Sequence, residues 1–164
     1  MGLEVMLSFF EAQTAEQYTQ ARALLREYAD WLGYDLDFQH FSEELAGLPG
    51  AYAPPGGRLL LATCDGALAG CVALRGLTRT VCEMKRLYVR PGFRHRGIGR
   101  RLAEDVIQAA GAAGYQRMRL DTLAHMEPAR ALYRLLGFRQ VAPYYDNPLP
   151  GAIFFELDLS KASG

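Results

Sequence analysis

The sequence lacks net charge and any long hydrophobic run. Its 164 residues carry 18 basic and 18 acidic side chains, so the formal net charge at pH 7 is zero. A neutral chain is a poor electrostatic partner for nucleic acid, which attracts basic surfaces. No apolar run approaches the roughly 20 residues that a membrane-spanning helix needs. We therefore expect neither nucleic acid nor a membrane as a partner.

A secretory signal and an even set of cysteines are also missing. The N-terminus, Met1–Glu4, has no basic stretch followed by an apolar one, so we expect a cytoplasmic protein. The three cysteines, Cys64, Cys71 and Cys82, lie in runs that are typical of strands. We interpret them as buried small hydrophobic residues in a reducing compartment, and we expect no metal site.

Half of the residues are hydrophobic, and no repeat, linker or low-complexity segment divides the chain. We expect a single domain over residues 1–164. Hydrophobic spacing predicts strands at Glu4–Glu11, Arg58–Cys64, Ala67–Leu74, Val81–Val89, Tyr115–Leu123, Phe138–Val141 and Ile153–Leu159. It predicts helices at Thr14–Trp31, at Phe38–Leu48, at about Gly97–Ala112, and from Pro128 to Gly137. This order predicts an α/β fold with a mixed central sheet of about seven strands, flanked by helices.

Local signals mark several element ends. Thr14 is a candidate N-cap, and Gly33 is placed to end the first helix. The dipeptide Asp65-Gly66 predicts a tight hairpin turn. Pro128 suits a first helical turn, and Gly137 suits a left-handed helix end.

The segment Arg94–Arg101, which reads Arg-His-Arg-Gly-Ile-Gly-Arg-Arg, breaks several local rules at once. It opens a helix whose predicted apolar face carries Ile98, Leu102, Val106 and Ala110. Arginines are unfavourable at a helix N-terminus, and Gly97 and Gly99 each lower helix propensity by about 1 kcal/mol. A bound phosphate explains these costs, because the glycines would let the backbone approach it and the arginines would neutralise it.

Two common phosphate-binding motifs do not fit this segment. A P-loop would need Gly-Lys-Ser/Thr, and the third glycine of a dinucleotide fingerprint would fall at Leu102. The segment instead resembles the Arg/Gln-x-x-Gly-x-Gly/Ala signature of the GNAT N-acetyltransferase superfamily. Cys82–Val89 resembles the strand before that family's coenzyme loop, and Ala131–Phe138 resembles its Ala-Leu-Tyr…Gly-Phe helix end. The resemblance covers essentially the whole chain and implies the acyl-CoA N-acyltransferase fold.

The resemblance implies that acetyl-coenzyme A is the cosubstrate. Its pyrophosphate would lie at the arginine loop, and its pantetheine arm would lie between Val81–Val89 and Tyr115–Leu123. The implied contacts are Leu87, Tyr88, Val89, Arg94, His95, Arg96, Gly97, Ile98, Gly99 and Arg100. One position departs from the family pattern: Met126 stands where many members carry an asparagine near the coenzyme.

The resemblance also implies direct attack of an amine on the thioester in a ternary complex, with much of the acceleration coming from positioning. Tyr133 is the candidate general acid, since a phenol with a pKa near 10 is a proton donor at neutral pH. Its alternative role is packing in the core. Glu83 is the candidate base, and its alternative is an ion pair with Lys85 or Arg86. Asp121 is the competing base, ahead of His125 and His40.

The acceptor is expected to be a primary amine of a small molecule or amino acid. Two clusters mix aromatic rings with carboxylates, which suits a cationic amine: Tyr28, Trp31, Tyr34, Asp35 and Phe38, and Tyr144–Asn147. Packing and solvated loop charge are the alternative for both clusters. Protein N-terminal or lysine acetylation and a non-catalytic acyl-coenzyme A sensor are the alternative functions. Family habit implies a homodimer, with Ile153–Phe155 as a contact.

Overall fold

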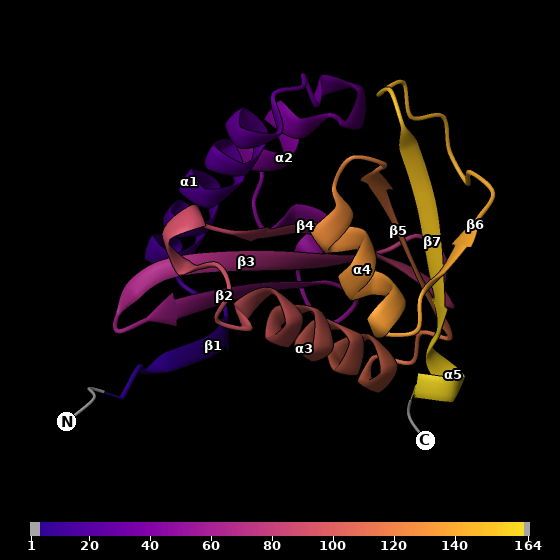
Figure 1. The fold of residues 1–164 in the computed structure, drawn as a ribbon. Coiled ribbons are helices and arrows are strands. Elements are labelled where there is room, and N and C mark those ends of the chain that lie inside the picture. The colour runs from indigo at the N-terminus through magenta and orange to yellow at the C-terminus, as the bar shows by residue number, and fades with distance from the viewer. Residues whose placement is uncertain (1–3, 163–164) are drawn as a thin grey trace.

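The computed structural model describes residues 4–162, and their seven strands form one sheet in the order β1-β2-β3-β4-β5-β7-β6 (Figure 1). The strands are β1 (Leu7–Glu11), β2 (Arg58–Cys64), β3 (Ala67–Gly76), β4 (Val81–Val89), β5 (Arg117–Leu123), β6 (Arg139–Val141) and β7 (Ala152–Asp158). Neighbouring strands pair antiparallel, except that β4 and β5 pair parallel. The predicted α/β fold with a mixed sheet of seven strands is confirmed.

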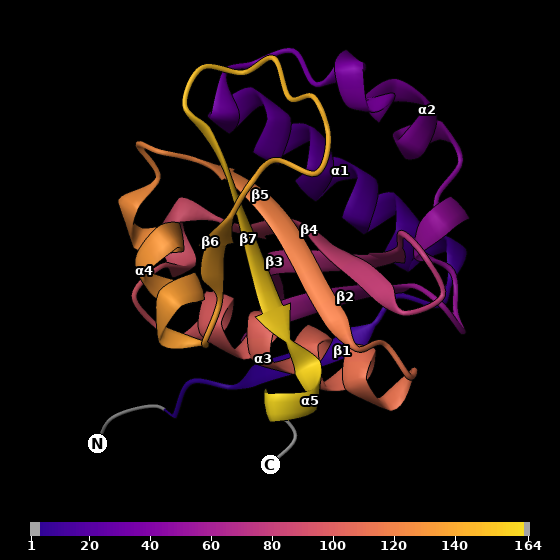
Figure 2. The same cartoon turned by 90° about the vertical axis from the view of Figure 1, so that its right-hand side faces the viewer.

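Helices cover both faces of the sheet (Figures 1 and 2). The α-helices are α1 (Ala15–Leu32), α2 (Phe41–Ala46), α3 (Ile98–Ala112), α4 (Glu127–Leu135) and α5 (Leu159–Ala162). Three short 3₁₀ turns occupy Asp37–Gln39, Gly50–Tyr52 and Pro91–Phe93. One core lies under α1 and α2, and the other lies under α3 and α4. The predicted apolar face of α3 is fully buried in the second core.

The turn signals act as predicted. The Thr14 side chain accepts a hydrogen bond from the Gln17 backbone, and Gly33 ends α1 with a φ of 78°. Asp65 and Gly66 both have positive φ, which fits the tight hairpin between β2 and β3. Gly137 has a φ of 99° after α4. All three cysteines are buried and free.

Some element ends differ from the predicted ones. The first strand begins at Leu7, three residues after the predicted start. The predicted helix Phe38–Leu48 is divided into a 3₁₀ turn and α2, because His40 between them has a left-handed φ of 58° that interrupts helical bonding. No helix among residues 4–162 is long and apolar enough to cross a membrane.

Most of the contact predicted for a homodimer is buried within the chain. Phe154 and Phe155 are 3% and 0% exposed, because β7 lies between β5 and β6 and both rings pack inside the chain. Ile153 is half-buried against the same core. A homodimer stays a prediction, although two of the three residues predicted for its contact are buried within the chain.

A β-bulge in β4 interrupts the regular strand pairing at the centre of the sheet. Cys71 pairs with Tyr88 and Ala73 pairs with Lys85, so two residues of β4 stand opposite one residue of β3. The bulge includes Arg86, whose φ of 62° is uncommon for a residue other than glycine. Pairing of β4 with β5 is confined to Val81–Glu83. Beyond that point the two strands separate, and the backbone of β4 no longer bonds to β5.

Candidate active site

A cavity of about 570 Å³ is lined by residues of α1, β4, β5, α3 and α4. Its volume is in the range of small-molecule sites. Residues of β4 from Met84 to Val89 form one wall, and Asp121, Thr122 and Leu123 of β5 form another. The separation of β4 from β5 therefore coincides with the cavity.

Residues of the predicted anion site line part of this cavity. Gly97 caps α3 with a φ of 78°, no described side chain caps the first turn, and no acidic residue lies in it. A Cβ at Gly97 would contact nothing within 4 Å, and one at Gly99 would contact only Val89. The first N–H groups of a 15-residue helix, with a backbone that a ligand can approach closely, fit the pyrophosphate of coenzyme A.

Eight of the ten predicted coenzyme residues line the cavity: Leu87, Tyr88, Val89, Arg94, His95, Gly97, Ile98 and Gly99. The other two have different surroundings. Arg96 donates to the Cys64 sulfur at 3.2 Å, and the exposed Arg100 forms an ion pair with Glu104. Their part in coenzyme binding stays a prediction.

Arg94 links the loop to the rest of the site. Its Nε donates to the Val89 carbonyl at 3.0 Å. Its guanidinium lies 4.9 Å from the centre of the Trp31 ring, a cation–π distance. Trp31 belongs to α1 and also contacts the Tyr88 ring. Arg94 therefore connects the predicted anion site to α1 through its contact with Trp31.

Tyr133 lies on α4, where its ring packs against Phe138 and Phe155. It is 7% exposed and lines the cavity. Burial is the main reason that its pKa is raised, so the phenol stays protonated at neutral pH. No described residue forms a hydrogen bond with its hydroxyl. Tyr133 therefore has both the packed ring of a core tyrosine and an unused proton donor.

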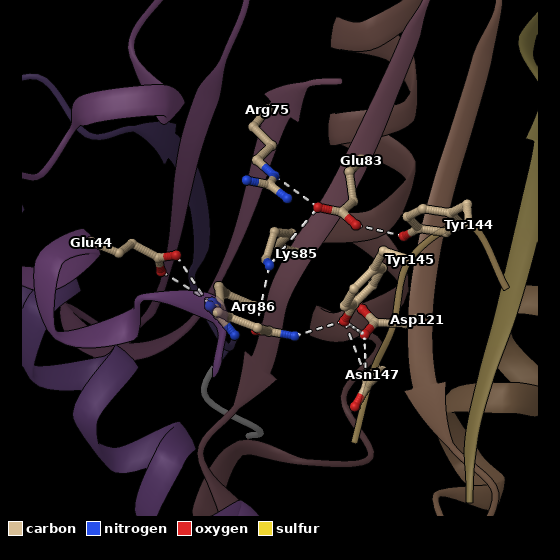
Figure 3. A network of polar contacts seen from close by, with 10 residues as sticks. Glu44, Arg75, Glu83, Lys85, Arg86, Asp121, Tyr144, Tyr145 and Asn147 are labelled. Atoms are coloured by element: carbon tan, nitrogen blue, oxygen red, sulfur yellow. Dashed lines mark hydrogen bonds and ion pairs between the residues drawn. The ribbon is translucent and has the colours of Figure 1, made fainter. Parts of the chain in front are cut away.

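Glu83 has a firmly bound carboxylate (Figure 3). It is 1% exposed, accepts from Arg75 Nε at 2.8 Å, and accepts from the Tyr144 hydroxyl. Lys85 is more distant, with 3.8 Å between Nζ and Oε1. Glu83 is not among the described residues that line the cavity. A base role would require a proton path through a neighbouring side chain or water.

Asp121 does line the cavity. Its Oδ2 accepts hydrogen bonds from the Tyr145 hydroxyl and, at 2.7 Å, from Asn147 Nδ2 (Figure 3). Tyr145 also accepts from Gln39 Nε2 at 2.9 Å. Asp121 is thus the acidic residue with direct access to a ligand, held by the loop between β6 and β7.

Only some residues of the two predicted acceptor clusters line the cavity. Tyr28 and Trp31 line the cavity from α1, and Asn147 lines it from the last loop. Tyr34, Asp35 and Phe38 are not among the lining residues. Of the two histidines considered as bases, His125 lines this cavity and His40 does not.

Sequence reasoning did not select Gln39, Lys85 and Arg86, which also line the cavity. Lys85 and Arg86 are 8% and 5% exposed. Arg86 donates to both oxygens of Glu44, at 3.0 and 3.1 Å. Two successive cations inside a strand expected to be buried were the available signal, since a buried charge requires a partner.

Comparison with known proteins identifies relatives of this chain. Residues 12–138 match the model of the Acetyltransferase (GNAT) family. An uncharacterized N-acetyltransferase of Schizosaccharomyces pombe is 42% identical over 142 residues, which cover 85% of this chain and 87% of the relative.

Solved structures share the fold. A GNAT-family acetyltransferase from Staphylococcus aureus superposes with a TM-score of 0.78 at 20% identity, covering 94% of this chain and 99% of that one. An acetyltransferase from Salmonella typhimurium, solved with its cofactor acetyl-CoA, gives a TM-score of 0.67 at 18% identity, covering 93% and 94%.

Gly99→Val should raise the Kd for acetyl-coenzyme A at least about ten-fold, because the side chain would occupy space that the pyrophosphate is expected to use. Isothermal titration calorimetry measures the change. Gly111→Val is the matched control, since Gly111 lies in the same helix, outside the cavity, with open space around its Cβ. Equal affinities in both variants and the parent would remove this turn from the coenzyme site.

Proposed function

This chain belongs to the GNAT acetyltransferase family and is an acetyl-CoA-dependent N-acetyltransferase, and we propose that its acceptor is a primary amine of a small molecule or amino acid. One observation carries the proposal. The glycine turn of α3, the β4 bulge, Tyr133 and Asp121 all line the same cavity. A coenzyme and a small acceptor held there would meet within one cavity.

We also propose that residues 1–164 form a single GNAT domain. The pairing of all seven strands into one sheet supports it. Acetyl-coenzyme A, as cosubstrate, would be held by the first turn of α3 and by the backbone of Leu87, Tyr88 and Val89. Its thioester supplies the activated acetyl group.

The proposed reaction is direct attack by the neutral amine on the thioester carbonyl. The C–N bond forms as the C–S bond breaks, and the thiolate leaves. A backbone N–H of β4 beyond the bulge would stabilise the developing oxyanion, since that part of the strand does not pair with β5. Tyr133 would donate its proton to the leaving thiolate, and the attacking nitrogen, positively charged once the C–N bond forms, would release its second proton, through water, to restore the phenol.

The acceptor ammonium must lose a proton before it attacks. Asp121 is the better placed of the two candidate bases, because it lines the cavity and Glu83 does not. We therefore propose that Asp121 receives the proton, directly or through water. Glu83 would act only through a neighbouring side chain or water, and of its neighbours Lys85 lines the cavity whereas Tyr144 does not.

Thiol release from acetyl-coenzyme A tests the function. The protein is incubated separately with amino acids, with polyamines and other small amines, and with lysine-containing peptides. We expect turnover with small amines. Turnover with peptides alone would support protein acetylation instead. Coenzyme binding without turnover in any pool would support the sensor.

Tyr133→Phe should lower kcat by about 10²-fold while the Kd for the coenzyme changes little, since the lost proton donor acts only as the thiolate departs. The ring and its packing remain. Steady-state kinetics and coenzyme titration measure the two effects. Tyr115→Phe is the matched control, because Tyr115 lies outside the cavity and its hydroxyl donates to the Gly56 carbonyl. A Tyr133 variant with normal kcat would assign this residue to the core alone.

Asp121→Asn and Glu83→Gln separate the two candidate bases. In the variant that lacks the base, the low-pH limb of the kcat/KM profile should shift toward the pKa of the amine, with activity recovering at high pH, where the amine is already neutral. We expect this in Asp121→Asn. In Glu83→Gln we expect a lower Tm with an unchanged profile, because Arg75 and Lys85 lose their partner. The reverse pattern would make Glu83 the base.

A further inference from the structure

Lys85 is a buried cation whose partners are both distant. It lies in β4, is 8% exposed, and lines the cavity. Its Nζ is 3.8 Å from Glu83 Oε1 and 3.4 Å from Gln39 Oε1. An ammonium has three donors, and hydrogen bonds of this kind are normally about 2.7–2.9 Å long. The ammonium is therefore incompletely satisfied by the described residues.

The glutamates near Lys85 are already paired with arginines, so the local charge around Lys85 is positive. Glu83 is bound closely by Arg75, with 2.8 Å between Nε and Oε1. Glu44 is occupied by Arg86, which donates to both of its oxygens. The group of Arg75, Lys85 and Glu83 thus contains two cations and one anion (Figure 3).

The surroundings also disfavour the charge on Lys85. Burial lowers the pKa of Lys85 to about 8, and the nearby charges of Arg86 and Arg75 act in the same direction. Glu83 and Asp121 raise it but do not balance the burial. An anion placed beside the ammonium would offset this cost.

A negative group stands on another wall of the same cavity. Asp121 is joined to Lys85 through Gln39 and Tyr145, by hydrogen bonds of 3.4 Å from Lys85 to Gln39 and 2.9 Å from Gln39 to Tyr145. Asp121 is the only acidic side chain among the described residues that line the cavity. A polyamine with several cationic groups would therefore find one carboxylate for all of them.

We propose that Lys85 binds a carboxylate of the acceptor while Asp121 faces its amine, so that the acceptor is an amino acid and not a simple amine or polyamine. This rests on the proposed function and narrows its substrate class. The acceptor would bring its carboxylate to the incompletely satisfied ammonium of Lys85 and its amine to the carboxylate of Asp121.

Matched acceptors test this on the unchanged protein. Acetylation of each amino acid is compared with that of its decarboxylated amine and its carboxamide, with rates normalised to the fraction of neutral amine. We expect kcat/KM at least about ten-fold higher for the amino acid of the best pair. Equal or faster acetylation of decarboxylated amines would overturn the proposal. The proposed function would survive that outcome and would fail only if no small amine were acetylated.

Lys85→Met and Lys85→Gln test the residue itself. Each should raise KM for the best amino acid at least about ten-fold with a smaller change in kcat, and should abolish its advantage over the decarboxylated amine. Arg79→Gln is the control, because Arg79 is exposed and outside the cavity. A fall in kcat that is equal for both acceptors would contradict carboxylate binding and would place Lys85 elsewhere in the mechanism.

Discussion

The site depends on the bulge at Arg86. A regular β4 would continue its ladder with β5 and close the sheet where the cavity lies. The left-handed backbone at Arg86 is held by contacts from outside the strand: Glu44 binds its guanidinium, the Phe41 ring lies 5.0 Å from it, and the Cys71 thiol donates to its carbonyl. The short helix α2 thus maintains the opening in the sheet, although none of its residues lines the cavity.

This dependence explains what the sequence could predict. The hairpin at Asp65-Gly66, the cap at Thr14 and the glycine turn before α3 are local, because neighbouring residues determine their conformations. The bulge is not local. Within Val81–Val89, Arg86 reads as a strand residue, and its conformation depends on Glu44, 42 positions earlier. Splayed strands therefore had to be inferred from family resemblance.

The contrast between local and long-range features also applies to the candidate site. The proposed coenzyme loop could be predicted from the sequence, because its arginines and glycines are unfavourable at the start of a helix unless an anion binds. The proposed acceptor site could not be predicted from the sequence as one group. Its linked residues come from four separate segments: Gln39, Lys85, Asp121 and Tyr145. Tyr145, in the loop between β6 and β7, joins Gln39 to Asp121 of β5 only in the folded chain. Glu83 was selected for its place on the central strand, and only the fold reveals how closely Arg75 binds its carboxylate.

The position of Arg94 would couple the binding of the two substrates. Its guanidinium is shared between the Val89 carbonyl and the Trp31 ring of α1, and α1 also contributes Tyr28 to the cavity. A coenzyme phosphate that drew this guanidinium toward itself would change the packing of the cavity wall beside the proposed acceptor site. Linkage then requires the reciprocal effect, in which an occupied acceptor site alters coenzyme affinity by the same factor. The two substrates would bind as a thermodynamically coupled pair.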